Sequence, residues 1–416
     1  MTFSELREKF DAVSYDKFTC SESDDSYDIN YYYSLGEFHF VHRLSILKRD
    51  FFRPENLEDK DVFLFHLGLC ELISYYKAAC PKKVILKAGA LREEQMDFWK
   101  KLFYNGLGEF RFLNHIEISY EDFVVFENAT DTIYSKSKIG NVEGNLIPVG
   151  GGKDSAVTLE LLKKEKAHNT CFIVNPRGAT LDTVTVAGYN AEDSVIVMRK
   201  IDPLLLQLNQ EGYLNGHTPF SASLAFLGMF CALLAGKQYI VLSNESSANE
   251  STDEETGANH QYSKSLEFEL DFVEYTERYV NPFMKYFSLL RGMREIDIAR
   301  QFAEYKQYHK IFRSCNRGSV GGKNEWCGKC SKCLFVYIIL APFLSEEEMT
   351  TIFGRNLLND LELEKYYREL AGIDKTKPFE CVGTRAEVKE AIRMIAEKYQ
   401  ENLPILIEKY PELWQK

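Results

Sequence analysis

Residues 150–155 bring together the residue types that bind a phosphate group. After the apolar run that ends at Val149, the chain reads Gly150, Gly151, Gly152, Lys153, Asp154 and Ser155. The glycines allow backbone N–H groups to wrap around an anion, and a helix that begins here adds the positive end of its dipole. Lys153 can add a positive charge and Ser155 a hydroxyl donor. A carboxylate beside phosphates requires a cation between them, so we interpret Asp154 as a Mg²⁺ ligand. The alternative is a glycine turn without a ligand.

The spacing of this loop excludes two common nucleotide-binding motifs. A Walker loop needs Ser or Thr directly after Gly-Lys, where this chain has Asp154, and the dinucleotide fingerprint G-x-G-x-x-G is missing. The segment instead resembles the SGGxDS loop of the PP-loop ATP pyrophosphatases, with Gly150 in place of the first serine. That resemblance implies an enzyme that binds ATP and Mg²⁺, adenylates a substrate oxygen and releases pyrophosphate.

Polar side chains also follow two other predicted strands. In a doubly wound sheet, ligands bind outside the carboxyl ends of the strands at the point where the strand order reverses. If the sheet order resembles that of the PP-loop enzymes, the strand 239–243 lies beside the strand before the glycine loop, and Ser243, Asn244 and Glu245 emerge next to that loop. We interpret Glu245 as a second Mg²⁺ ligand or an acid–base group, and the alternative is a capping turn. Asn175 resembles the adenine-binding edge of PP-loop enzymes.

Two further segments carry side chains that can transfer protons or bind phosphate. His217 precedes a predicted helix, and the stretch NHQYSKS contains His260, Tyr262 and Lys264. Together with Glu245 these are the candidate catalytic residues. A histidine taken singly is more often a hydrogen-bonded structural residue, and the sequence does not identify which side chain takes a proton.

Four of the ten cysteines form the cluster SCN…WCGKCSKC, which contains Cys315, Cys327, Cys330 and Cys333. Four thiolates close a tetrahedral shell, which suits structural Zn²⁺. An iron–sulfur cluster also takes four thiolates, so the spacing leaves that alternative open. The other cysteines are scattered without a disulfide framework, which is typical of cytosolic thiols.

Short apolar runs alternate with helical segments after residue 145. The candidate strands are Leu146–Val149, Cys171–Val174, Ser194–Met198, Tyr239–Ser243 and Lys285–Leu289. The candidate helices between them are Ser155–Lys166, Pro219–Leu234 and Phe268–Tyr279. Strands that alternate with helices form βαβ units, which predicts an α/β fold with a doubly wound parallel sheet. The resemblance of the glycine loop implies that this sheet is of PP-loop type.

The sequence predicts three units along the chain. Residues 1–140 mix strand-like and helical pieces and end in a polar linker, which indicates an N-terminal α+β domain. Residues 141–310 form the predicted ATP-binding domain. Residues 311–416 contain the four-cysteine loop and mainly helical sequence, so we expect a helical C-terminal region that the metal site attaches to the nucleotide domain.

The composition argues against nucleic-acid and membrane partners. The chain has 416 residues and a formal net charge of −12, so no global basic surface for nucleic acid is expected. The N-terminus MTFSELREKF lacks the apolar region of a secretory signal, and the longest apolar run, Leu334–Leu344, is too short to span a membrane. These features predict a cytoplasmic protein and leave its oligomeric state open.

A longer series of motifs resembles one family over most of the chain. GGGKDS, NGHTPFSA, SNESSAN, NHQYSKS, SCN…WCGKCSKC, IFGRNLL and KPFECVG occur in this order, as in the UDP-N-acetyl-α-D-muramoyl-L-alanyl-L-glutamate epimerases. The resemblance implies an ATP-consuming isomerase of peptidoglycan precursor synthesis. Its substrate would be the UDP-muramoyl dipeptide UDP-MurNAc-L-Ala-L-Glu, whose terminal L-Glu is inverted through a carboxyl-adenylate, with release of AMP and pyrophosphate.

Three other functions are compatible with parts of the sequence. A PP-loop enzyme that modifies RNA would share the glycine loop, although the acidic composition disfavours it. A ligase similar to the 7-cyano-7-deazaguanine synthases would share the four-cysteine spacing. A non-enzymatic nucleotide-binding zinc scaffold would bind ATP without turnover.

Overall fold

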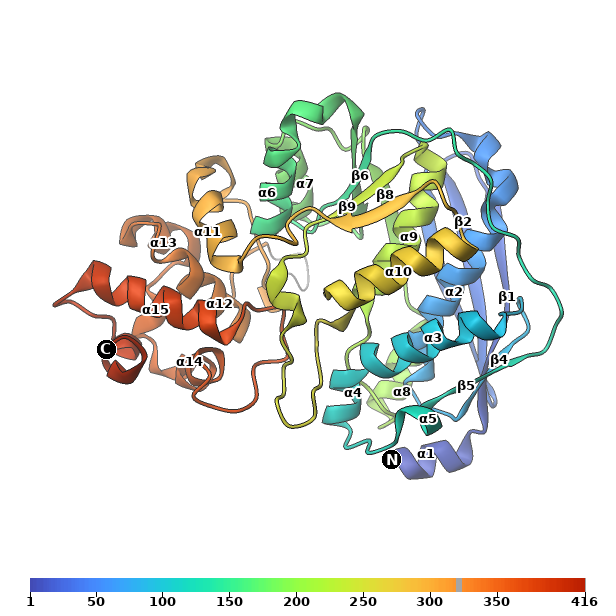
Figure 1. The fold of residues 1–416 in the computed structure, drawn as a ribbon, viewed down its shortest axis with the longest axis horizontal. Helices are drawn as coiled ribbons and strands as arrows, with labels where there is room; N and C mark the ends of the chain where they lie inside the picture. Colours follow the sequence, from blue (N-terminus) through green and yellow to red (C-terminus); the bar gives the residue numbers. More distant parts are fainter. Residues whose placement is uncertain (319–323, 416) are drawn as a thin grey trace.

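A single ten-stranded sheet forms the centre of the protein (Figure 1). The computed structural model describes residues 1–318 and 324–415. The strand order is β10-β9-β6-β7-β8-β3-β2-β1-β4-β5. The strands are β1 (Ala12–Glu22), β2 (Ser26–Leu35), β3 (Phe38–Leu47), β4 (Lys83–Leu86), β5 (Val125–Asn128), β6 (Asn145–Pro148), β7 (Asn169–Val174), β8 (Val195–Lys200), β9 (Tyr239–Leu242) and β10 (Lys285–Ser288). The pairing is antiparallel from β8 through β3 and β2 to β1 and parallel elsewhere. The fold is therefore mixed α/β with a mostly parallel sheet.

The strand order reverses at β6. The five strands predicted after residue 145 are confirmed as β6 to β10, with small differences at their ends. The predicted neighbourhood of the first and fourth of them is also confirmed, because β6 is parallel to both β7 and β9. The chain runs from β6 through β7 to β8 on one side and then returns to β9 and β10 on the other. In open α/β sheets such a reversal is where ligands bind, outside the carboxyl ends of the strands.

Helices cover the parallel half of the sheet on both faces. The helices are α1 (Phe3–Lys9), α2 (Lys60–Tyr76), α3 (Glu93–Gly106), α4 (Gly108–Leu113), α5 (Tyr120–Phe123), α6 (Lys153–Leu161), α7 (Gly178–Val186), α8 (Pro203–Gln210), α9 (Phe220–Ala235), α10 (Leu266–Tyr279), α11 (Glu295–Glu304), α12 (Ser331–Leu340), α13 (Glu346–Phe353), α14 (Glu364–Ala371), α15 (Arg385–Tyr399) and α16 (Ile405–Glu408). Because successive strand residues point to opposite faces, Leu146 joins the core formed with α2 and α9, and Ile147 joins the core formed with α6, α11 and α12.

The C-terminal helices gather at one end of the molecule. In Figure 1, α12 to α15 lie on the side opposite to β1, β4 and β5. α12 and α15 pack against α11, and α13 and α14 pack against α12. α11 in turn packs against α6 in the second of the two cores. Among the described residues, none of the helices combines the length and apolar character that crossing a membrane requires.

The sheet continues across the boundary predicted between residues 140 and 141. β3 pairs with β8 from Arg43 opposite Lys200 to Ile46 opposite Val197. Arg199 of β8 also donates to both carboxylate oxygens of Glu71 in α2, at 2.9 and 2.5 Å. Glu71 is fully buried, and breaking a buried ion pair leaves an uncompensated charge. The units 1–140 and 141–310 therefore share one sheet and one hydrophobic core.

Candidate active site

A cavity of about 670 Å³ lies at the carboxyl ends of β6, β7 and β9. Its walls come from the glycine loop after β6, the turns after β7 and β9, and two C-terminal segments, 313–316 and 380–381. The predicted nucleotide-binding residues in its lining are Gly150, Gly152, Asp154, Ser155, Asn175, Ser243 and Asn244. Lys264, Cys315 and Cys381 line it as well. The structure thus brings together most of the predicted site at the point where the strand order reverses.

The glycine loop has a shape that requires glycine at its centre. Gly151 has a φ of +81°, and a Cβ atom there would lie 2.8 Å from the carbonyl carbon of Ala179 and 2.9 Å from the amide nitrogen of Thr180. Gly152 is the N-cap of α6, and the first N–H groups of a helix have no partner within it. Within the described part of the chain, no atom lies within 4 Å of a Cβ position on Gly150. The loop is therefore an open cradle of backbone donors that suits an anion.

Gly151→Ala and Gly150→Ser are expected to have opposite effects on nucleotide binding. Alanine at position 151 would press on the backbone of Ala179 and adopt a strained φ, which costs about 1–3 kcal/mol. We expect the affinity for a non-hydrolysable ATP analogue to fall about tenfold or more. Serine at position 150 enters open space and restores the residue of the SGGxDS loop, so affinity should be kept or should rise by up to about 1 kcal/mol. Isothermal titration calorimetry measures both, and equal affinities would contradict this role of the loop.

Lys153 lies beneath the loop and does not line the cavity. Its buried amine contacts Asp154 Oδ1 at 2.5 Å and Glu295 Oε1 at 2.7 Å. Burial alone would lower the pKa of Lys153, but these two carboxylates outweigh it and raise that pKa. Burial raises the pKa of Glu295 to about 8, against the attraction of Lys153. The charged lysine therefore orients Asp154 at the cavity wall, instead of presenting its own amine to a phosphate as the sequence suggested.

The carboxylate of Glu245 is hydrogen-bonded to a neighbouring serine. Its two carboxylate oxygens accept hydrogen bonds from Ser247, one from the backbone amide and one from the hydroxyl at 2.8 Å. The side chain caps the helical turn Ser246–Asn249, which matches the capping alternative considered from the sequence. Burial raises the pKa of this carboxyl. Glu245 therefore does not line the cavity, whereas its neighbours Ser243 and Asn244 do.

Asn175 shapes the turn after β7. It has a φ of +49°, a conformation that asparagine adopts more readily than most residues. Its side-chain amide donates to the carbonyl of Arg199 at 3.0 Å and accepts from the amide of Arg199 at 2.7 Å. These bonds occupy the side chain, and the backbone amide of Asn175 donates to the carbonyl of Val197 at 2.8 Å, so Asn175 holds the cavity wall in place.

Two of the predicted acid–base residues form a polar cluster beside the cavity. The rings of His217 and His260 lie 4.2 Å apart, and His260 Nδ1 hydrogen-bonds Glu109 of α4. Burial lowers the pKa of His217 to about 3, and the charges of His260 and Lys264 act in the same direction. Burial alone would lower the pKa of His260 too, but hydrogen bonds to Cys381 and Glu109 raise it to about 9. At neutral pH, His217 is therefore neutral and His260 is charged.

Lys264 and Tyr262 line two different cavities. The Lys264 amine lies 3.0 Å from the sulfur of Cys381, in the wall of the large cavity. Tyr262 lines a separate cavity of about 340 Å³ together with Asn105 and Arg111, and burial raises its pKa. The structure therefore keeps Lys264 among the candidate catalytic residues of the large cavity and separates Tyr262 from them.

Cys381 lines the cavity with its sulfur 3.0 Å from the Lys264 amine, and it is not among the site residues predicted from the sequence. It was grouped with the scattered cysteines, although its segment KPFECVG is one of the motifs that carried the family resemblance. That motif was the feature of the sequence that could have indicated a role for Cys381. Its partners Lys264 and His260 stand more than a hundred positions earlier in the chain, so the cluster becomes visible only in the folded protein. Glu109 was missed for the same reason.

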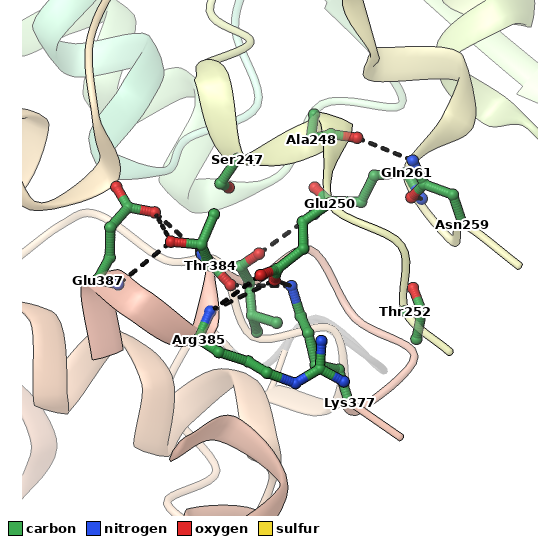
Figure 2. Close-up of polar contacts among 12 residues, drawn as sticks. Ser247, Ala248, Glu250, Thr252, Asn259, Gln261, Lys377, Thr384, Arg385 and Glu387 are labelled. Carbon is green, nitrogen blue, oxygen red and sulfur yellow. Dashed lines mark hydrogen bonds and ion pairs between the residues drawn. The ribbon is translucent and has the colours of Figure 1, made fainter. Parts of the chain in front are cut away.

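A clamp of charged groups holds the segment around Cys381 against the loop that follows β9 (Figure 2). Glu250 accepts a hydrogen bond from the amine of Lys377 at 2.5 Å and another from the backbone amide of Arg385 at 3.3 Å. Lys377 is buried and also donates to the carbonyl of Gly383 at 3.0 Å. The chain is thus fixed on both sides of Cys381.

The four clustered cysteines bring their sulfur atoms into one site: Cys315, Cys327, Cys330 and Cys333. The sulfur of Cys330 lies 3.8 Å from that of Cys315 and 3.5 Å from that of Cys333, and Cys327 and Cys333 are 3.6 Å apart. Zinc–sulfur bonds of about 2.3 Å in a tetrahedron place the sulfurs about 3.8 Å apart. The backbone amides of Gly318 and Lys329 donate to these sulfurs, which suits thiolates. The cluster can therefore hold a single metal ion such as zinc.

The four-cysteine cluster shares a wall with the glycine loop. The backbone amide of Arg313 donates to the carbonyl of Gly151 at 2.8 Å, and Ser314 lies next to Gly152. Cys315 lines the cavity, and Cys330 is the N-cap of α12. The cluster therefore links the start of the C-terminal helices to the loop that forms the anion cradle.

Comparisons with known proteins cover most of the chain. The family model described as "MurL N-terminal domain" matches residues 4–289, and that described as "MurL C-terminal domain" matches residues 311–413. No solved structure matches.

Three similar proteins carry the name UDP-N-acetyl-alpha-D-muramoyl-L-alanyl-L-glutamate epimerase. The protein of Xanthomonas oryzae pv. oryzae is 34% identical over 338 residues, which are 80% of this chain and 74% of that protein. The protein of Salinispora tropica is 35% identical over 335 residues, 78% of this chain and 71% of its own length. The protein of Micromonospora sp. is 34% identical over 349 residues, which are 82% of this chain and 77% of that protein.

These matches confirm the resemblance that the order of motifs indicated. They extend over the ten-stranded sheet, the glycine loop and the C-terminal region with the four cysteines. The proteins matched are named as epimerases, which are isomerases. The chain therefore belongs to the MurL family, the UDP-N-acetyl-α-D-muramoyl-L-alanyl-L-glutamate epimerases.

Proposed function

We propose that the protein inverts the terminal L-Glu of UDP-MurNAc-L-Ala-L-Glu to D-Glu in peptidoglycan precursor synthesis. In this proposal it consumes ATP, forms a carboxyl-adenylate and releases AMP and pyrophosphate. The names of the similar proteins support the substrate. The observation that carries the ATP chemistry is the cavity at β6, where the glycine loop and Asp154 meet the amine of Lys264.

The cavity has the features that a triphosphate needs. The close approach of Gly151 to Ala179 leaves a concave backbone surface, and the N-terminus of α6 adds free N–H donors. Asp154, oriented by Lys153, would hold the Mg²⁺ ion that neutralises phosphate charge and favours attack on the α-phosphorus. The turn after β7, with Asn175, would take the adenine side of the nucleotide.

Adenylation explains why an isomerase would consume ATP. The α-proton beside a carboxylate is hard to remove, because the carbanion would form next to a full negative charge. Joining AMP to the carboxylate removes that charge and gives a carbonyl that can accept the electron pair as an enolate. A planar enolate can take a proton on the opposite face, which inverts the centre. Water then releases AMP and the D-Glu product.

We assign Zn²⁺ to the four-cysteine cluster as a structural ion. Three of the separations between the sulfurs are 3.5 to 3.8 Å, and all four sulfurs lie within 4.8 Å of one another, which fits one tetrahedral ion. A cluster of several iron atoms would need its thiolate ligands farther apart. Four thiolates leave no open coordination position, so we expect the ion to fix the wall of the nucleotide site and to take no part in the chemistry.

Chiral analysis of the product tests the proposed function. The protein is incubated with UDP-MurNAc-L-Ala-L-Glu and Mg²⁺, with or without ATP, and glutamate is resolved after acid hydrolysis of the peptide. We expect D-Glu only with ATP, together with AMP and pyrophosphate. Inversion without ATP, or ATP binding without turnover, would reject the proposal; the second outcome is the one a nucleotide-binding scaffold would give.

A further inference from the structure

Cys381 lines the proposed nucleotide cavity and lies next to two cationic side chains, Lys264 and His260. Its sulfur lies 3.0 Å from the Lys264 amine and hydrogen-bonds the His260 imidazole. Lys332 donates to the backbone carbonyl of Cys381. Cys381, Lys264 and Asp154 line one cavity, so the thiol faces the space in which the substrate carboxyl would be activated.

The charged groups around the sulfur favour a thiolate. Burial would raise the pKa of Cys381, but Lys264, His260 and Lys332 outweigh it and hold that pKa well below its usual range. A negative charge on the neighbouring Glu380 would disfavour the thiolate, but burial raises the pKa of Glu380 and so favours its neutral form. The charge of Cys381 in turn raises the pKa of Lys264. Thiol and amine therefore form an ion pair at neutral pH, the environment that activates cysteines.

Glu109, His260 and Cys381 form a chain of hydrogen bonds that ends at the cavity. Glu109 contacts Nδ1 of His260, and the same ring contacts the thiol. A reactive group, a histidine beside it and an acid that orients the histidine form the general arrangement of activated side chains in enzymes. The clamp formed by Glu250 and Lys377 holds the cysteine within reach of this histidine.

The other candidate bases fit the role of proton acceptor less well. At neutral pH, Lys264 and His260 already carry a proton. Tyr262 lines the second cavity, and His217 is not part of the lining of the first. Asp154 is assigned to Mg²⁺ and Cys315 to the four-cysteine cluster, so among the described residues of the cavity wall the Cys381 thiolate is the remaining side chain that combines an electron pair with cationic support.

We propose that Cys381 is the catalytic base that removes the α-proton of the adenylated glutamate, with His260 and Lys264 as positioning residues. This inference rests on the proposed epimerase reaction. In the step, the α-C–H bond breaks, an S–H bond forms on Cys381, and the electron pair moves to the acyl oxygen to give the enolate. Adenylation comes before this step and does not need the thiol.

The inference predicts that Cys381→Ala separates adenylation from proton exchange. The wild type, Cys381→Ala and Cys381→Ser are incubated with the UDP-muramoyl dipeptide, ATP and Mg²⁺ in D₂O. Pyrophosphate is measured together with deuterium at the α-carbon of glutamate. We expect both variants to release pyrophosphate while α-deuterium incorporation falls by about 10²–10⁴-fold, the usual contribution of a general base. Cys20→Ala, at a partly buried cysteine of β1, is the matched control and should behave as the wild type.

The outcomes separate this inference from the proposed function. If the wild type produces neither pyrophosphate nor D-Glu, the proposed function fails. If the wild type is active and Cys381→Ala still incorporates deuterium at the wild-type rate, the assignment of Cys381 is overturned and the epimerase proposal stands. Loss of pyrophosphate release together with exchange in both variants would also overturn it, because the thiol would then serve adenylation or the fold.

Alkylation of the native protein gives a second test that does not depend on a folded cysteine variant. Iodoacetamide labelling at pH 6, followed by peptide mapping, should modify Cys381 faster than Cys20, and ATP with Mg²⁺ should protect Cys381. Lys264→Met removes the largest favourable charge, so the pKa of Cys381 should rise and its labelling at pH 6 should slow. Equal labelling of Cys381 in the wild type and in Lys264→Met would overturn the ion pair on which the inference stands.

Discussion

Asp154→Asn should slow pyrophosphate release strongly and leave the protein folded. Asparagine keeps the size of the side chain and an oxygen that can accept from Lys153, and the hydrogen bond between Lys153 and Glu295 is kept. The substitution removes the charge that a Mg²⁺ ligand supplies. We expect the rate of pyrophosphate release to fall by about 10²–10³-fold, the usual loss when one group that stabilises transition-state charge is removed. Release is measured by a coupled pyrophosphate assay over a range of Mg²⁺ concentrations.

Asp193→Asn is the matched control for this prediction. Asp193 is an exposed carboxylate that hydrogen-bonds Asn190 and lies outside the large cavity. It should keep the wild-type rate and the wild-type dependence on Mg²⁺. If Asp154→Asn and Asp193→Asn release pyrophosphate equally fast, Asp154 is not the metal ligand of the nucleotide site.

Cys330→Ser is expected to remove the bound metal and, with it, nucleotide binding. Cys330 provides one of the four clustered sulfurs and caps α12. Apparent binding free energies of structural zinc are about 10–16 kcal/mol in small domains, comparable with the total stability of a folded domain, about 5–15 kcal/mol. Loss of the ion should therefore loosen the segment 313–316, which contacts Gly151 and Gly152. We expect loss of zinc by elemental analysis, a lower melting temperature and an ATP affinity below detection.

Cys171→Ser separates the metal effect from that of losing any buried thiol. Cys171 is a fully buried cysteine of β7 outside the cluster. Its variant should lose some stability, because a buried hydroxyl needs a partner, and should keep one zinc ion per chain together with ATP binding. Full ATP binding by a metal-free Cys330→Ser protein would contradict the structural role of the cluster.

The parts of the site that could be predicted from the sequence have local signals. The glycine loop, the strand before it and the helix after it are adjacent in the chain, so residue types and their order suffice. The close spacing of Cys327, Cys330 and Cys333 likewise suffices to predict a metal site. The five strands from β6 to β10 follow from short apolar runs between helical segments. The pairing of β6 with β9 was expected on the condition that the sheet order resembles that of the family whose glycine loop this chain shares, and the structure shows that pairing.

The direction in which a side chain points could not be predicted from the sequence, because contacts with residues far along the chain or with competing neighbours determine it. Lys153 looks like a phosphate ligand in the sequence, but the buried Glu295, far along the chain, draws its amine beneath the loop. Glu245 looks like a metal ligand, but Ser247 satisfies both of its oxygens. The cluster of Cys381 with Lys264 depends on the clamp that brings residues 377–385 to the loop after β9.

The single sheet was not foreseen for the same reason. The sequence predicts that the N-terminal strands form an α+β unit of their own and that the polar stretch 127–145 is a linker. Nothing in the sequence of β3 shows that it pairs with β8. The buried pair of Glu71 and Arg199 that locks this junction joins residues 128 positions apart, and such contacts arise only from the packed fold.

Transfer of ¹⁸O from the substrate to AMP tests the central claim most directly. UDP-MurNAc-L-Ala-L-Glu with ¹⁸O in the α-carboxylate of glutamate is incubated with unlabelled ATP and Mg²⁺, and the AMP is examined by mass spectrometry. If the carboxylate attacks the α-phosphorus and water later attacks the acyl carbon, each AMP carries one ¹⁸O atom. Unlabelled AMP, or ADP and orthophosphate as the products, would contradict the carboxyl-adenylate.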